Sequence, residues 1–145
     1  MKKYFFIVSV LLLVTFVANS CKKQPGTGGM ATIQGKIWVR QYDRYFAALS
    51  YQYAGNNQSV YILYGNTPGL GGKGQNTKTD YQGNFQFQYL QQGDYKIYVY
   101  SADSAAVIGP PLNRYAPQIA ILKDVNISGR KQTVDIGTLT ILINK

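Results

Sequence analysis

The sequence predicts an all-β protein: a single Greek-key β-sandwich of seven or eight strands, preceded by a cleaved signal peptide. Two observations carry this prediction. Runs of alternating apolar and polar residues recur from about residue 31 to the end, and short segments rich in Gly, Asn and Asp separate them. The composition agrees, since the 145 residues include 13 Tyr and 15 Gly and few segments that favour helix.

The first 20 residues have the order of charge and hydropathy of a secretory signal peptide. Lys2 and Lys3 begin it, and an apolar run over residues 5–18 ends in small and polar residues before Cys21. The run is shorter than the about 20 residues that a membrane-spanning helix needs. A permanent transmembrane anchor is therefore disfavoured.

Cys21 is the single cysteine of the chain and lies at the expected cleavage site. The residues before it resemble the lipobox of bacterial lipoproteins, although the strongest form of that motif has Leu at the place of Ala18. The resemblance implies acylation of Cys21 and attachment to a membrane by lipid chains. An ordinary signal peptide with an incidental cysteine is the alternative. We expect a signal peptide over residues 1–20, a lipidated cysteine and flexible tether over 21–30, and the β-sandwich over 31–145.

The strands of the first half follow from period-two patterns. One face of the first strand carries Ile33, Gly35, Ile37 and Val39. Residues 41–57, rich in Tyr, Phe and Ala, predict a long excursion that covers part of the sandwich, with room for a short extra strand. A buried strand is expected over 59–64, a Gly-rich loop over 65–75 and a short strand over 77–80.

Two turns flank the next strand. Asp80 and Gly83 occupy the first and last places of a predicted type I turn. Residues 91–94 predict a second turn, in which Gly93 is suited to positive φ and Asp94 is the last residue. The strand between the turns is expected to carry three aromatic side chains on one face: Phe85, Phe87 and Tyr89.

Three further strands are expected, over residues 95–100, 119–127 and 134–143. The apolar positions of the last strand change from even to odd numbers after Gly137. A β-bulge at this glycine would keep both sets inward. The residues concerned are Val134, Ile136, Leu139, Ile141 and Ile143.

Residues 79–100 resemble the central signature of the carboxypeptidase-regulatory-like, or transthyretin-like, β-sandwich domains. The shared pattern is Thr, Asp, two free positions and Gly, then an alternating aromatic strand, then Leu, Gly, an aromatic residue and another strand. Residues 35–37 and 134–137 also fit, so the resemblance covers about residues 31–143. It implies a carbohydrate-binding-like fold without shared catalytic residues. It extends to small lipoproteins of the Bacteroidetes type, which implies a lipid-anchored place in the outer membrane, on its periplasmic or cell-surface side.

The composition argues against several classes of function. The chain has no His, and all six acidic residues are Asp. A zinc or copper site would lack its usual ligands, and acid–base catalysis needs converging titratable groups that the separated Asp residues do not indicate. The Gly-rich segment 69–74 matches a dinucleotide motif but leads toward a strand, so we interpret it as a loop and expect no cofactor. The 15 basic residues are scattered, which argues against nucleic-acid binding despite the net charge of +9.

Three aromatic residues remain as candidates for ligand contact. Trp38 lies on the nominally polar face of the first strand, and Tyr98 and Tyr100 share a face of the strand expected over residues 95–100. Exposed rings can stack on sugars or anchor a protein, whereas cross-strand packing is the structural alternative. We expect a non-enzymatic envelope lipoprotein that serves as a binding or structural module, with a glycan or an envelope protein as partner. A glycan-binding accessory protein is the alternative, and a hydrolase a minor one.

Overall fold

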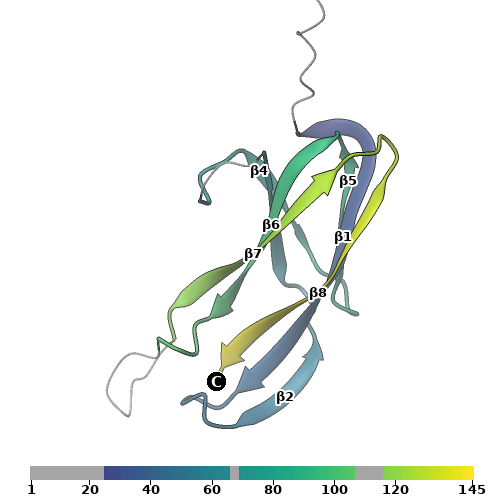
Figure 1. The fold of residues 1–145 in the computed structure, drawn as a ribbon. Coiled ribbons are helices and arrows are strands. Elements are labelled where there is room, and N and C mark those ends of the chain that lie inside the picture. Colours follow the sequence, from purple (N-terminus) through teal and green to yellow (C-terminus); the bar gives the residue numbers. More distant parts are fainter. Residues whose placement is uncertain (1–24, 66–68, 107–115) are drawn as a thin grey trace, which may run out of the picture.

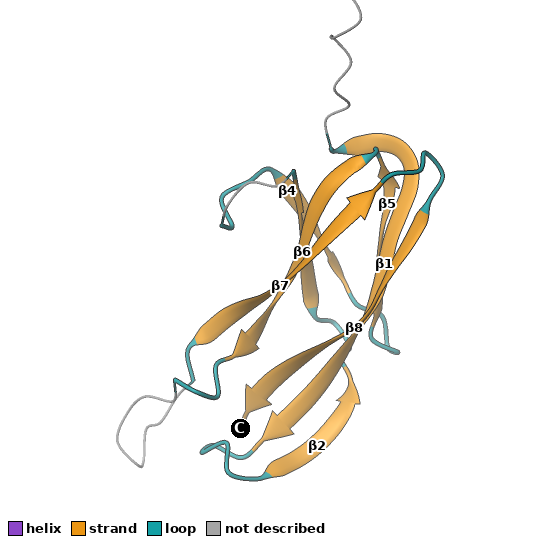
Figure 2. Cartoon of the chain, viewed as in Figure 1, coloured by secondary structure: helices purple, strands orange, loops and turns teal. Residues whose placement is uncertain are grey.

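The computed structural model describes residues 25–65, 69–106 and 116–145. The predicted signal peptide and the lipidation site at Cys21 lie outside these residues. Eight strands form two four-stranded sheets that pack face to face (Figures 1 and 2). The all-β sandwich is therefore confirmed. None of the described segments is a helix long and apolar enough to cross a membrane.

The two sheets divide the chain unevenly. Sheet A contains β1 (Thr27–Tyr42), β2 (Leu49–Ala54), β5 (Asn84–Leu90) and β8 (Thr133–Asn144). Sheet B has the order β4 (Gly74–Lys78), β3 (Ser59–Tyr64), β6 (Gly93–Ala102) and β7 (Gln118–Ile127). Within the excursion expected over residues 41–57, β2 is the extra strand.

The long first strand organises sheet A. It pairs in parallel with β8, from Thr32 with Thr133 to Tyr42 with Asn144. On its other side β5 pairs antiparallel with its first half, and β2 with its second half. Because β1 joins all three partners, its outward face forms the middle of one wide surface.

The core lies between the two inner faces. Sheet A contributes Ile33, Ile37, Val39, Phe85, Phe87, Leu90, Leu139 and Ile141, and sheet B contributes Val60, Ile62, Tyr95, Ile97, Val99, Val125 and Ile127. Burying one such side chain contributes about 1.5–3 kcal/mol. The described domain therefore has a hydrophobic core that requires no disulfide.

The change of parity in the last strand corresponds to a bulge. Gln34 pairs with Asp135 and Lys36 with Thr138, so β8 holds one more residue than β1 at this point. Gly137 has a φ of 74°, which glycine adopts readily. Leu139 and Ile141 are buried on the far side of the bulge.

A second bulge corrects the expectation for Tyr89. Ala31 pairs with Leu90 and Ile33 with Phe87, so β5 also carries an extra residue. Tyr89 has a φ of 60° and is 69% exposed, whereas Leu90 takes the buried place. The left-handed backbone of a non-glycine residue costs about 1–2 kcal/mol. The sequence pattern concealed the bulge because both residues are apolar.

The amino-terminal segment is more ordered than the tether expected over residues 21–30, because β1 begins at Thr27. The Tyr95 hydroxyl accepts a hydrogen bond from the Gly26 N–H at 3.1 Å and donates one to the Gln91 carbonyl at 2.7 Å. The Gln91 N–H donates to the Gly26 carbonyl at 2.9 Å. Gly26 is thus tied to the connection between β5 and β6.

Two further boundaries differ from expectation. The fourth strand covers Gly74–Lys78 and ends before Asp80, because it pairs with β3 over that range. Gly93 has the expected positive φ, at 147°, but it already begins β6. Asp94 therefore belongs to a strand and not to a turn, and its carboxylate accepts a hydrogen bond from the side chain of Asn126 at 2.7 Å.

Candidate functional site

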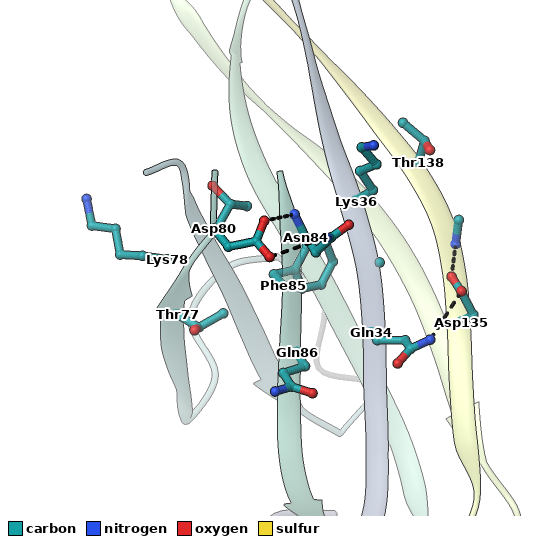
Figure 3. Close-up of a pocket in the computed structure, with 13 residues that line it drawn as sticks. Gln34, Lys36, Thr77, Lys78, Asp80, Asn84, Phe85, Gln86, Asp135 and Thr138 are labelled. Carbon is teal, nitrogen blue, oxygen red and sulfur yellow. Dashed lines mark hydrogen bonds between the residues drawn. The ribbon is translucent and has the colours of Figure 1, made fainter. Parts of the chain in front are cut away.

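A polar groove lies on the outward face of sheet A, beside the end of β4 (Figure 3). Its volume is about 730 Å³. The lining is mainly amide, hydroxyl and charged side chains on β1, β5 and β8, with β4 and the segment after it at one side. The lining residues are Gln34, Gly35, Lys36, Thr77, Lys78, Thr79, Asp80, Asn84, Phe85, Gln86, Asp135, Gly137 and Thr138.

The alternation of β1 and β5 builds the floor of the groove. Inward residues such as Ile33 and Phe85 fill the core, so their neighbours Gln34, Asn84 and Gln86 point outward. Gly35 allows the strands to pack closely here, since a Cβ atom would lie 2.8 Å from both Ile136 Cγ1 and Phe85 Cζ.

The bulge at Gly137 helps to fix one wall. The Gly137 N–H donates to Asp135 Oδ1 at 2.8 Å, and Gln34 Nε2 donates to Asp135 Oδ2 at 3.3 Å. Both oxygens of this carboxylate therefore have a donor. The Gln34 amide is in turn held across the β1–β8 pair, as Figure 3 shows.

Asp80 organises the turn at the other side. Its Oδ1 accepts hydrogen bonds from the backbone N–H groups of Gln82 and Asn84, at 2.9 and 2.8 Å. The Gly83 N–H donates to the Asp80 carbonyl at 3.0 Å, and Gly83 has a φ of 80°. The hydrogen bond from the Asn84 backbone holds the pKa of Asp80 below its ordinary value, so this carboxylate stays ionised.

Two carboxylates that are far apart in the sequence line the same groove. Asp80 and Asp135 lie on opposite sides of it, with β5 and β1 between them (Figure 3). Since neighbouring strands are about 4.8 Å apart, the two carboxylates are separated by roughly 10 Å or more. Each is already hydrogen-bonded to the protein.

Trp38 lies on the same face of β1 as Lys36, outside the groove lining. The ring is partly exposed, and its Nε1 donates to Gln52 Oε1 at 3.4 Å. Lys36 Nζ lies 5.8 Å from the ring centroid, within the range of a cation–π interaction. Trp38 therefore extends the groove surface along β1.

Tyr98 and Tyr100 lie on the outward face of sheet B, so the structure does not bring the three predicted aromatics together. The Tyr98 ring stacks on that of Tyr61 with centroids 4.8 Å apart and is only 8% exposed. Burial raises the pKa of the Tyr98 hydroxyl. Tyr100 is 41% exposed and meets both rings edge-on. Cross-strand packing accounts for Tyr98 and leaves Tyr100 available.

The sequence did not predict a role for the amide side chains of the groove. Gln34, Asn84 and Gln86 looked like ordinary solvent-facing residues, and their only signal was their outward parity. Over the described residues, no three His, Cys, Asp or Glu side chains gather into a group that could hold a metal ion.

Comparison with known proteins places the chain in no family. The sequence matches no protein-family model and no curated protein. Among solved structures, it is similar to a candidate carbohydrate-binding protein of Pseudomonas aeruginosa, with 15% identity, a TM-score of 0.46 and coverage of 83% of this chain and 91% of that one.

Two other similar structures are enzymes. One is a 9R-lipoxygenase of Cyanothece, with 15% identity, a TM-score of 0.43 and coverage of 97% of this chain and 23% of that one. The other is an (S)-allantoin synthase, with 10% identity, a TM-score of 0.40 and coverage of 78% and 42%. The chain thus spans less than half the length of either enzyme. Similarities of this size assign neither family nor function.

Proposed function

We propose that the sandwich is a non-catalytic binding module of the bacterial envelope and that its groove on sheet A binds a glycan. The observation that carries this proposal is the groove lining, in which amide and hydroxyl groups from three paired strands face one open surface. Binding sites usually fix their ligands with a few converging polar groups on a rigid scaffold. The strands of sheet A supply that scaffold.

The chemistry of the lining suits a ligand rich in hydroxyl groups. Each Gln or Asn side chain carries both a donor and an acceptor, so Gln86 can accept and donate toward neighbouring sugar hydroxyls. The Gln34 amide donates to Asp135 and keeps its oxygen and one N–H for a ligand, whereas the Asn84 amide donates to Asp80 and Gln82 and offers its oxygen. Lys36 and Thr138 add further donors along the same surface. Trp38 provides a partly exposed ring for an apolar sugar face farther along β1.

The carboxylate geometry supports binding over hydrolysis. Glycosidases place their two carboxyl groups about 5 to 9.5 Å apart, and one of them has a raised pKa. Asp80 and Asp135 are separated by two strands, and the pKa of Asp80 is lowered. A lowered pKa does not suit a general acid, which must hold its proton near neutral pH.

A glycan array probed with the purified chain tests the proposal. We expect retention on a limited set of oligosaccharides and loss of that retention in Gln34→Ala, because the amide is removed from the groove while the core is untouched. Uniform absence of binding on a broad array would exclude a glycan ligand.

We further propose that acylation of Cys21 holds the module on the outer membrane. The N-terminal pattern of charge, apolar run and small residues supports this, as does the start of β1 at one end of the sandwich (Figure 1). Mass spectrometry of the N-terminal peptide from membranes should find a diacyl or triacyl Cys21, and Cys21→Ser should leave the protein unacylated.

A protein partner is the second candidate, favoured by a specific surface of sheet B. Tyr100 and Leu122 lie on neighbouring strands, where Tyr100 pairs with Ala120 and Tyr98 with Leu122. Their exposed fractions are 41% and 47%. In-cell crosslinking from Tyr100 would identify an envelope protein that binds there.

We also propose that the chain is a transthyretin-like domain with the Greek-key strand order of that group. The two-sheet sandwich and the signature at residues 79–100 support this proposal.

A further inference from the structure

One end of the sandwich, here called the amino-terminal pole, combines exposed apolar side chains with cations. The start of β1, the β5–β6 connection and the β7–β8 turn lie at this end, and the β3–β4 loop projects to one side of it (Figure 1). Backbone hydrogen bonds join them, from Gln91 to Gly26, from Gly65 to Asp94 and from Thr32 to Gln132. These hydrogen bonds hold the backbones of the segments together at this end of the sandwich.

Three large apolar side chains are exposed at this pole. Met30 at the start of β1 is 56% exposed, Leu70 in the β3–β4 loop 39%, and Tyr89 at the end of β5 69%. They come from three separate segments.

Tyr89 is the most informative of the three. Its φ of 60° is unfavourable for a residue with a side chain, and the bulge that imposes it turns the ring out of the core. The same bulge buries Leu90 and leaves the Tyr89 ring on the surface, and strained backbone beside an exposed aromatic ring is a reason to look for a function at that place. A ring with an apolar body and a polar tip suits the boundary between lipid and water.

Cations frame the same surface. Arg130 and Lys131 lie in the β7–β8 turn, and Lys73 lies at the end of the β3–β4 loop. Lys22 and Lys23 precede this pole in the sequence. Asp94 also lies at this end and keeps its negative charge, because the Asn126 amide that donates to its carboxylate is neutral, so it offsets one of the three cations of the described segments. The pole therefore has an excess of positive charge that attracts an anionic surface.

The length of chain before the pole limits how far it can lie from a lipid on Cys21. Gly26 is tied to Tyr95 and Gln91, so only residues 22–25 separate the fixed backbone from Cys21. Five residue steps span at most about 18 Å. Acylation of Cys21 would therefore hold this end of the sandwich within about that distance of the bilayer.

We propose that the amino-terminal pole docks on an anionic lipid surface, with Met30, Leu70 and Tyr89 at the interface and Arg130, Lys131 and Lys73 against the headgroups. The docking fixes which end of the domain faces the membrane. It rests on the proposed acylation of Cys21 for its strength, since the exposed side chains alone form a small contact.

The test uses the lipoprotein purified from membranes and reconstituted into phosphatidylcholine vesicles with or without about a third phosphatidylglycerol, a fraction that gives a negative surface potential. A fluorophore is attached to Ser128→Cys at the pole or to Tyr81→Cys in the β4–β5 turn at the other end. A quencher is carried on the lipid headgroups. We expect strong quenching at position 128, weak quenching at 81, and more quenching at 128 in the anionic vesicles.

Two matched pairs of variants complete the experiment, with the probe at position 128. Tyr89→Ser should reduce quenching, whereas Tyr81→Ser, which removes a tyrosine 89% exposed elsewhere, should not. Replacing Arg130 and Lys131 together with Gln should reduce the additional quenching that phosphatidylglycerol causes. Replacing Lys123 and Lys145 together with Gln should leave the effect of phosphatidylglycerol on quenching unchanged.

Equal quenching at the two probes, or equal effects within either matched pair, would overturn the docking proposal. The mass of the N-terminal peptide is measured on the same sample, so a missing acyl group is recognised separately. An unacylated Cys21 would contradict the acylation on which the docking rests, whereas equal quenching at the two probes in an acylated sample would contradict the docking alone.

Discussion

Gln34 Nε2 donates a hydrogen bond to Asp135 Oδ2 at 3.3 Å, across the parallel pair of β1 and β8. The two residues are 101 positions apart in the sequence. Asp135 also accepts a hydrogen bond from the N–H of Gly137 at the bulge. This contact therefore connects an irregularity needed for core packing with the polar surface proposed to bind a glycan.

Gly35→Ala should destabilise the fold. The added methyl group would meet Ile136 and Phe85 at 2.8 Å, and overpacking of this kind costs about 1–3 kcal/mol. Urea unfolding of the purified chain measures the change. Gly71→Ala is the matched control, because its Cβ would meet nothing within 4 Å. Equal stability of the two variants would show that the β1–β5–β8 packing is looser than the structure indicates.

Tyr95→Phe should also destabilise the fold, because the lost hydroxyl leaves the Gly26 N–H without this acceptor and the Gln91 carbonyl without this donor. The expected cost is about 1–3 kcal/mol. Thermal unfolding measures it, with Tyr89→Phe as the control at an exposed hydroxyl. A second readout is proteolysis after Lys23, which should accelerate as the amino-terminal segment detaches. Unchanged stability and cleavage would contradict the role given to Tyr95.

Asp80 should make stability depend on acid pH. The Asn84 backbone hydrogen bond lowers the folded-state pKa of Asp80 below its value in the unfolded chain. The ionised group therefore stabilises the fold above its unfolded pKa of about 4, and this contribution is lost as the pH falls through the lower folded-state pKa. The difference in urea midpoint between the unsubstituted chain and Asp80→Asn should be constant near neutrality and shrink below about pH 4. If the difference in urea midpoint were the same at pH 7 and pH 2, ionisation of Asp80 would not be the source of the stabilisation.

The periodic parts of the fold could be predicted from sequence, since side-chain alternation is a local consequence of strand geometry. The strand at 59–64 and the bulge at Gly137 are examples. Tyr89 could not be placed, because Phe85, Phe87 and Tyr89 form an unbroken pattern. Leu90 lies inward instead, because it pairs with Ala31 on β1 and the Tyr95 hydroxyl holds the carbonyl of the next residue, Gln91. Both contacts involve residues outside the strand pattern.

The candidate site was harder to predict than the fold. The groove depends on β8 lying in parallel beside β1 and on β4 ending beside β5 in the other sheet. These are long-range relationships without a local pattern. Polar residues on an outward face are expected in any sandwich, so nothing distinguished Gln34 and Gln86 from Gln88.

The most direct test of glycan binding at the groove compares Gln86→Ala with Gln88→Ala. The two glutamines are exposed residues of the same strand, but only Gln86 lines the groove. Titration calorimetry with an oligosaccharide identified on the array measures both variants against the unsubstituted chain. Loss of one hydrogen-bonding side chain should weaken binding by about 0.5–1.5 kcal/mol, or roughly two- to tenfold, in Gln86→Ala, and Gln88→Ala should bind normally. Equal affinities for the two variants, or a loss confined to Gln88→Ala, would contradict the proposed site.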